Sequence, residues 1–324
     1  MTAPIRLELP TGFELGTVNA YLFTGPEPVL VDTGLKSEAS WVALQSGLAQ
    51  HQLTVADLSR VVITHPHVDH CGQARRIADQ SQAEISIAGL GAPWLLDFTN
   101  RLAERTIYYR DRLLPLLALP PEASQWVLAH LEILTTMVDA VPADRINTFQ
   151  PGDTLPLGGL SWQVLHAPGH ARAQTCFYQA DTRQFLAADM LLARAPAPVA
   201  EKPAHESQPG TPALSQFLES LTMVEALDID QVYPGHGAPF THHRQVIQRQ
   251  RDRIELRKTE CLDLIAAGHH TVAALVANMY GLYPPKVHLT GLWMLIGYLS
   301  LLEAEGGIVR EVVDGVWFYR CVKN

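Results

Sequence analysis

The sequence predicts an α+β protein in which helices cover β-sheets, with a helical insert and a small C-terminal domain. Short β-rich runs alternate with stretches of helical spacing through residues 1–240. One unusually long helical block, residues 92–145, interrupts this alternation. Beyond residue 240 the pattern changes to helices followed by a hairpin signal, so residues 241–324 are predicted to form a winged-helix-like domain.

The predicted strands are short runs rich in β-branched and aromatic residues, and several end at a polar or charged residue. Loops that follow strand ends over a rigid sheet are a common place for a functional site. Helices are expected at Glu38 to Gln50 and at Thr211 to Leu227, with a proline-rich loop over Ala195 to Pro212. The strands are expected at Ala20 to Thr24, Pro28 to Asp32, Val61 to Thr64, Glu84 to Ala88, Trp162 to His166, Phe185 to Asp189 and Gln231 to Tyr233.

The helical block at residues 92–145 is dense in aromatic and leucine side chains, including Trp94, Phe98, Tyr108 and Tyr109. One interpretation is a pair of amphipathic helices packed on the domain or on a second subunit, which leaves a homodimer open. The other is a lid that covers the substrate entrance, because large apolar surfaces rarely stay exposed without a binding purpose. The pattern alone does not separate the two.

The C-terminal part, residues 241–324, contains a charged helix that carries Arg249, Arg253 and Arg257 on one face. Two further helices are expected, at Thr271 to Tyr280 and at His288 to Glu303, before a hairpin over Ile308 to Tyr319 that turns at Asp314-Gly315. Ten Lys or Arg against eight Asp or Glu give this part 10 − 8 = +2 charges. That excess is too small to establish nucleic-acid binding.

Composition limits the choice of partners and of compartment. The formal net charge of −9 repels a phosphate backbone at long range, so nucleic acid is the less expected partner. The four cysteines form no C-x-x-C pair, which argues against a secreted disulfide scaffold. Residues 1–12 do not resemble a secretory signal, and no apolar run approaches the roughly 20 residues that span a bilayer. We therefore expect a cytoplasmic protein without a membrane partner.

The strongest chemical signal is a polar cluster directly after the strand at Val61 to Thr64. Residues two apart in an extended segment point the same way, so His65 and His67 can converge on one ion. Asp69 and His70 stand where a helix from about Cys71 to Gln80 is expected to begin, and they are free to address a second ion. Nitrogen ligands with a carboxylate suit zinc, with iron or manganese as alternatives.

Three further candidate ligands follow later strands: His170 in Pro-Gly-His, Asp189 in Ala-Asp, and His236 in Pro-Gly-His-Gly. A glycine beside each of these histidines lets the backbone turn sharply or pass close to a ligand. Cys71 is weighed separately, because a thiolate is an excellent zinc ligand, whereas a free cysteine at a helix start is more often a small buried side chain.

The intact motif H-x-H-x-D-H, followed in order by His170, Asp189 and His236, resembles the metallo-β-lactamase superfamily over roughly the first 240 residues. The resemblance implies a four-layer αββα sandwich with a site at one edge of the sheets. It also implies that Asp32, in Val-Asp-Thr-Gly, orients ligands without binding metal. Ala188 departs from the glycine of many relatives. The implied ligands are His65, His67 and His170 for one metal, Asp69, His70 and His236 for the other, and Asp189 as the bridge.

This resemblance implies a hydrolase that uses two metal ions, expected as two zinc ions per chain, and a bridging hydroxide. A small-molecule thioester, ester or lactone is the expected substrate. The C-terminal part resembles the beta-lactamase-like protein 2 group, which includes nucleases, so a single-strand ribonuclease is the alternative. A metal-retaining binding protein without turnover is a third hypothesis, which loss of a ligand would favour. None of the seven ligands is missing.

Overall fold

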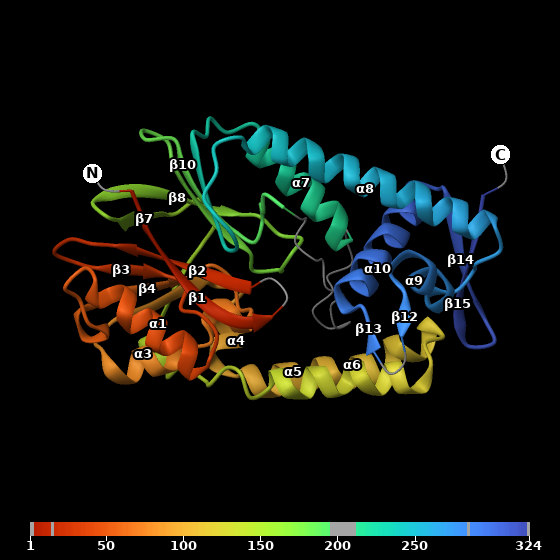
Figure 1. Cartoon of the computed structure of the whole chain (residues 1–324), viewed down its shortest axis with the longest axis horizontal. Coiled ribbons are helices and arrows are strands. Elements are labelled where there is room, and N and C mark those ends of the chain that lie inside the picture. The colour runs from red at the N-terminus through yellow and green to blue at the C-terminus, as the bar shows by residue number, and fades with distance from the viewer. Residues whose placement is uncertain (1–2, 14–15, 195–211, 284–285, 323–324) are drawn as a thin grey trace.

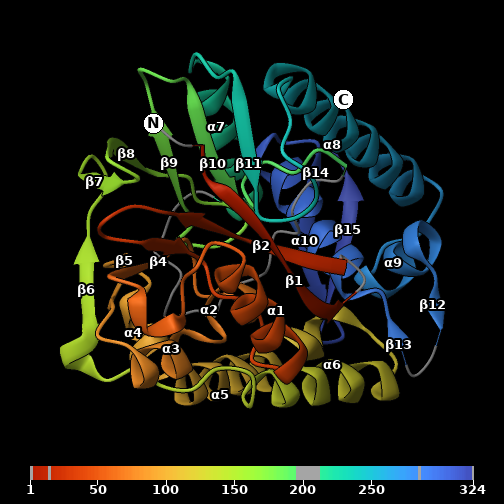
Figure 2. The same cartoon turned by 60° about the vertical axis from the view of Figure 1, so that its left-hand side comes forward.

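Two β-sheets lie face to face at the centre of the N-terminal part, residues 1–240, and helices cover their outer faces (Figures 1 and 2). The computed structural model describes residues 3–13, 16–194, 212–283 and 286–322. The expected loop over residues 195–212 lies almost wholly outside these ranges. The resulting order of layers is helix, sheet, sheet, helix, which agrees with the expected four-layer sandwich.

The first sheet has six strands in the order β1-β2-β3-β4-β5-β6. Its first three strands are antiparallel neighbours, whereas β3, β4, β5 and β6 run parallel. The parallel strands therefore end at one edge of the sheet, where their following loops meet. The strands are β1 Ile5–Phe13, β2 Gly16–Phe23, β3 Val29–Val31, β4 Arg60–Ile63, β5 Glu84–Ala88 and β6 Ile146–Phe149.

The second sheet has five strands in the order β11-β10-β9-β8-β7. β10 and β11 are parallel, and the other neighbours are antiparallel. Because β10 and β11 run the same way, the segments that follow them leave the sheet on the same side. The strands are β7 Thr154–Leu157, β8 Leu160–His166, β9 Thr175–Gln179, β10 Gln184–Ala188 and β11 Gln231–Pro234.

Aromatic side chains from both sheets form the core between them. The ring of Phe23 on β2 meets that of Trp162 on β8 at 5.7 Å between centroids, and Phe149 on β6 meets Phe177 on β9 at 5.8 Å. All four side chains are buried, and both pairs have the edge-to-face geometry that aromatic quadrupoles favour. This core holds the two sheets at a set distance, so loops from both reach one common edge.

The helix that carries the central motif begins earlier than expected. The expected helix from Cys71 to Gln80 is two helices, α2 Val68–Cys71 and α3 Ala74–Gln80. The break follows from Gln73, whose backbone N–H donates to Thr33 Oγ at 3.2 Å instead of bonding along the helix. Because α2 begins at Val68, Asp69 lies inside its first turn and not ahead of a helix. The other outer helices of the N-terminal part are α1 Glu38–Ala49 and α7 Ala213–Glu225.

The helical insert comprises α4 Ala92–Leu96, α5 Phe98–Tyr108 and α6 Pro121–Leu134, with a π-helical turn over Tyr109–Leu113. It lies below both halves of the molecule in Figure 1 and contacts the C-terminal part. Buried Tyr109 packs on Trp293 with 5.1 Å between ring centroids. These contacts agree with packing on the protein itself, and the lid stays a prediction.

In the described residues of the C-terminal part there are three helices and two short antiparallel strand pairs. The turn between β14 and β15 has φ of 50° at Asp314 and 80° at Gly315, as the Asp-Gly signal predicts. No helix in the described ranges is long and apolar enough to cross a bilayer. The elements are α8 His243–Ala266, α9 Val272–Tyr280, β12 Leu282–Tyr283, β13 Lys286–Val287, α10 Leu289–Ala304, β14 Ile308–Val313 and β15 Val316–Cys321.

Candidate metal centre

The structure brings all seven predicted ligands together at one edge of the two sheets. They arrive on loops and on one short helix that follow strands of both sheets, so residues up to 171 positions apart in the sequence become neighbours. Each of the seven belongs to a group of three whose ligand atoms lie within 4.8 Å of one another. His65 and His67 follow β4, Asp69 and His70 lie in α2, His170 lies between β8 and β9, and Asp189 and His236 follow β10 and β11.

His65, His67 and His170 form the first group. His65 Nε2 lies 3.0 Å from His67 Nδ1 and 3.2 Å from His170 Nε2, and the last two nitrogens are 2.8 Å apart. A tetrahedral zinc ion with Zn–N bonds of 2.0–2.1 Å separates its ligand nitrogens by roughly 3.3 Å. The three nitrogens therefore stand close to the spacing that a shared metal ion requires.

Asp69, His70 and His236 form the second group, and Asp189 lies between the two groups. His236 Nε2 is 3.3 Å from Asp69 Oδ2. One oxygen of Asp189 is 3.4 Å from His70 Nε2, and the other is 3.4 Å from His236 Nε2 and 3.5 Å from His170 Nε2. The two carboxylate oxygens thus face ligand atoms of both groups.

Unpartnered buried atoms support a metal at this place. His70 Nε2, Asp189 Oδ1 and His236 Nε2 are buried and have no hydrogen-bond partner among the described residues. Buried polar atoms are normally satisfied, because leaving one without a partner costs about 1–3 kcal/mol. A divalent ion would satisfy them, and a set of imidazole nitrogens with carboxylate oxygens suits zinc, iron or manganese. The residues present therefore fit a metal centre.

The charge state of the first group favours metal binding. Burial, together with the neighbouring imidazoles, lowers the pKa of His67 to about 3 and brings the pKa of His65 well below its ordinary value. Both side chains are therefore neutral at pH 7. A neutral imidazole keeps a free nitrogen lone pair, which is the form that ligates a metal.

Carboxylates dominate the electrostatics of the second group. Burial alone would lower the pKa of His236, but Asp189 and Asp69 outweigh it and raise the pKa to about 10. Burial alone would raise the pKa of Asp189, but His70 and His236 bring it well below its ordinary range. This half of the centre is thus built to stabilise positive charge.

Asp32 contacts the ligand His70 and is not itself a member of the candidate metal groups. Its Oδ2 accepts a hydrogen bond from His70 Nδ1 at 2.8 Å, which leaves His70 Nε2 facing Asp189. Asp32 has φ of 63°, a strained value for a residue with a side chain. The next residue, Thr33, holds this conformation, since its backbone N–H and its hydroxyl both donate to the carbonyl of His70.

The contacts that hold the His236 loop could not be predicted from the sequence. His236 Nδ1 donates to the carbonyl of Thr17 at 2.8 Å. The amide of Asn19 donates to the carbonyls of Pro234 and Gly237 at 2.8 and 2.7 Å. No local sequence signal marks Thr17 or Asn19, because they contact the loop only once the two sheets pack together.

Two residues that lie near the ligands in the sequence, Cys71 and His166, lie apart from these groups. Cys71 is fully buried in the hydrophobic core, and burial strongly raises the pKa of its thiol. It belongs to none of the candidate metal groups found among the described residues. His166 Nε2 contacts the carbonyl of Arg172 instead of a ligand atom. Cys71 is therefore a small core side chain, the second of its two interpretations.

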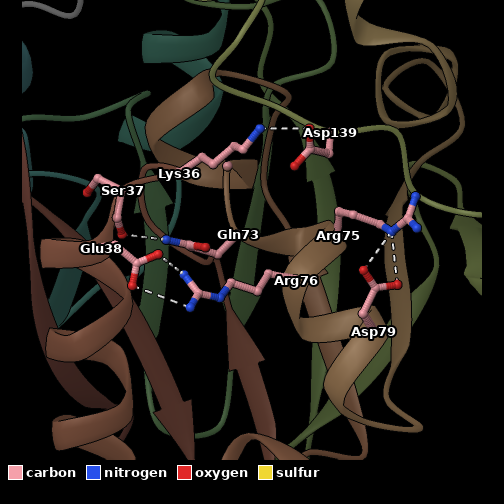
Figure 3. A pocket seen from close by; sticks show the side chains of 9 residues that line it. Lys36, Ser37, Glu38, Gln73, Arg75, Arg76, Asp79 and Asp139 are labelled. Carbon is pink, nitrogen blue, oxygen red and sulfur yellow. Dashed lines mark hydrogen bonds and ion pairs between the residues drawn. The ribbon is translucent and has the colours of Figure 1, made fainter.

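A surface pocket of about 440 Å³, lined mainly by residues of α3 and by the chain at the start of α1, contains none of the seven ligands (Figure 3). Each of its three cationic side chains already has a carboxylate partner in the same pocket. Lys36 pairs with Asp139, Arg75 with Asp79 and Arg76 with Glu38. Because these charges neutralise one another, the pocket gives no reason to expect a charged ligand.

A family model described as the metallo-beta-lactamase superfamily matches residues 14–236, more than half of the chain. The chain belongs to the metallo-β-lactamase superfamily. The matched range ends at His236, the last of the seven predicted ligands. Divalent-metal binding follows from this superfamily's fold, and hydrolysis is the class of reaction that membership indicates.

The chain is also similar to individual proteins and to solved structures. The chain is 27% identical to the probable metallo-hydrolase YqjP of Bacillus subtilis, over 99% of this chain and 98% of that protein. It is 23% identical to an atrochrysone carboxyl ACP thioesterase of Aspergillus fumigatus, over 86% of this chain and 73% of that protein. A beta-lactamase domain protein from Burkholderia ambifaria superposes with a TM-score of 0.84 at 23% identity, covering 99% of this chain and 93% of that one, which shows the shared fold.

Proposed function

We propose that this protein hydrolyses a carboxylic acyl bond, in a thioester, ester or lactone, at a centre of two metal ions. The observation that carries the proposal is the position of Asp189 between two groups of three ligands. His65, His67 and His170 would hold one ion. Asp69, His70 and His236 would hold the other. Asp189 would bridge the two, with zinc as the expected metal and iron or manganese as alternatives.

In this proposal the bound metal ions and the side chain of Asp69 would have different roles in hydrolysis. Bound divalent ions would supply Lewis-acid polarisation of the substrate carbonyl and a water whose pKa is lowered toward about 7. The Asp69 side chain is 13% exposed against 5% for Asp189, so Asp69 is the better placed to accept a hydrogen bond from a water that enters the site. Burial would raise the pKa of Asp69, but His70 and His236 lower it, which keeps the carboxylate ionised at neutral pH.

The net charge of the chain and its similarity to a thioesterase both favour an acyl substrate over RNA. The chain carries a net charge of −9, and the Arg257 guanidinium on α8 is already paired with Glu260. One relative is a thioesterase by name, which supports a thioester as the first choice. A thioester carbonyl needs no phosphate-binding cations around it, so the proposal does not depend on the arginines of α8.

A substrate panel tests the proposal. Metal-free protein is reloaded with zinc or manganese and assayed on a set of thioesters, on lactones and on single-stranded RNA. Asp189→Ala is the control. We expect acyl hydrolysis by the wild type. Asp189→Ala should lose nearly all turnover and hold fewer than two metals per chain by elemental analysis. RNA cleavage without acyl hydrolysis would overturn the substrate class. Two tightly held metals with normal turnover in Asp189→Ala would overturn the bridge.

A further inference from the structure

Thr64 joins a predicted ligand to the buried carboxylate beside the centre. Its hydroxyl oxygen lies 2.9 Å from Asp32 Oδ2 and 3.0 Å from His65 Nδ1. The exposed fractions of Thr64, Asp32 and His65 are 1%, 3% and 0%. Because these three side chains are shielded from water, each polar group must find its hydrogen-bond partner within the protein.

Counting protons sets the direction of these bonds. A carboxylate only accepts, and a hydroxyl has a single proton to donate. Thr64 therefore donates to Asp32, and its oxygen is left to accept from His65 Nδ1–H. A neutral imidazole with its proton on Nδ1 has a free lone pair on Nε2. That atom is the one that faces His67 and His170.

We propose that Thr64 is a positioning residue that links Asp32 to His65. Its hydroxyl donates a hydrogen bond to the Asp32 carboxylate and accepts one from His65 Nδ1–H. One buried carboxylate would then set the ring orientation and tautomer of a ligand in each half of the centre. It acts on His70 directly, through the 2.8 Å bond to Nδ1, and on His65 through the Thr64 hydroxyl. This inference rests on the proposed metal-dependent function and adds a residue that the ligand motif does not include.

The backbone of Thr64 is fixed independently of its hydroxyl. Its N–H donates to Asp32 Oδ1 at 2.9 Å, and its carbonyl accepts from the N–H of Thr175 at 3.0 Å. These two bonds tie the end of β4 to the β3 loop and to β9 of the other sheet. Valine has the shape of threonine without the hydroxyl, so Thr64→Val should remove the relay and leave both backbone bonds in place.

The test compares Thr64→Val with Thr64→Ser, which keeps the hydroxyl and loses the methyl group. Zinc affinity is measured by competition with a chromophoric chelator, alongside metal content and the melting temperature of the metal-free proteins. Loss of an outer hydrogen-bond partner typically weakens metal affinity by about 10- to 100-fold. We expect Thr64→Val to weaken one zinc-binding step by this amount and Thr64→Ser to bind close to the wild type.

Every outcome of this test bears on the relay. Wild-type zinc affinity in Thr64→Val would overturn it. Equal weakening in Thr64→Val and Thr64→Ser would also overturn it, because the methyl group and not the hydroxyl would then matter. A wild type that binds no divalent metal would overturn the proposed function together with the relay, and is distinguished from the first two outcomes by the wild-type titration alone.

Discussion

The four cysteines of the chain differ sharply in how far solvent reaches them. Cys71, Cys176 and Cys261 are buried, and burial raises the pKa of each thiol. Cys321 is partly exposed. A thiolate, not a thiol, attacks electrophiles and binds metals, so the three buried thiols should be inert.

Thiol labelling of the native protein should therefore modify Cys321 and spare the other three. Unfolded protein should be labelled at all four cysteines. Mass spectrometry after a short exposure to iodoacetamide measures this directly. Cys71→Ala should keep the wild-type metal content, because the side chain fills core space beside the ligands without joining them. Rapid native labelling of Cys71, or metal loss in Cys71→Ala, would restore its interpretation as a ligand.

Among the structural elements, the turn after β11 shows how closely the backbone approaches the centre. A Cβ atom added at Gly235 would lie 2.1 Å from Asp189 Oδ1 and 2.9 Å from His70 Cε1. The movable end of a side chain yields more easily than backbone, so the carboxylate of Asp189 would be displaced. Gly237, two residues later, has φ of 81° and open space where a Cβ atom would stand.

Gly235→Ala and Gly237→Ala should thus affect different quantities, the first metal affinity and the second stability. Gly235→Ala should lower metal affinity at least tenfold, in line with the losses that disturbed metal ligands typically cause. Gly237→Ala should keep the metals but cost roughly 1–2 kcal/mol of stability, because L-residues are strained at positive φ. Chelator competition and urea unfolding measure the two quantities. Normal metal affinity in Gly235→Ala would show that Asp189 does not need its present position.

Across the whole molecule, the C-terminal part contacts both the insert and the N-terminal part. α10 is apolar all round, and it packs on α7 and α8 as well as on its neighbours α9 and β14. α6 contacts β13, and Tyr109 of the insert packs on Trp293 of α10. The division at residue 240 is drawn where the sequence pattern changes, and it stays a prediction. Helices and strands on the two sides of it pack against one another.

We accordingly expect calorimetry to record one cooperative unfolding transition for the full chain. Tyr109→Ala removes a ring that is 2% exposed and should destabilise the whole protein by about 3–5 kcal/mol, as is typical for large aromatic residues in cores. The single transition should shift to lower temperature without splitting. Two transitions, of which Tyr109→Ala moves one alone, would show that residues 241–324 unfold as a separate domain.

Local patterns in the sequence determined much of this protein. The strands β4, β5, β10 and β11, the helices α1 and α9, and the Asp-Gly hairpin follow from alternation, helical spacing and turn chemistry, which depend on near neighbours in the chain. The strands β1, β6, β7 and β9 were not expected, because the stability of a strand depends on how its side chains pack against neighbouring strands and the facing sheet, which the local pattern does not show. The seven candidate ligands could be named because motif order and spacing survive in the sequence.

Only the tertiary structure decided how those residues meet. The separations within the two groups of ligand atoms, the place of Asp189 between them and the Asp32–Thr64–His65 contacts depend on two sheets packed face to face. The break between α2 and α3 likewise depends on Thr33, a residue from another loop that accepts the hydrogen bond of the Gln73 N–H. Such contacts are set by long-range packing, and a pattern of neighbouring residues carries no record of them.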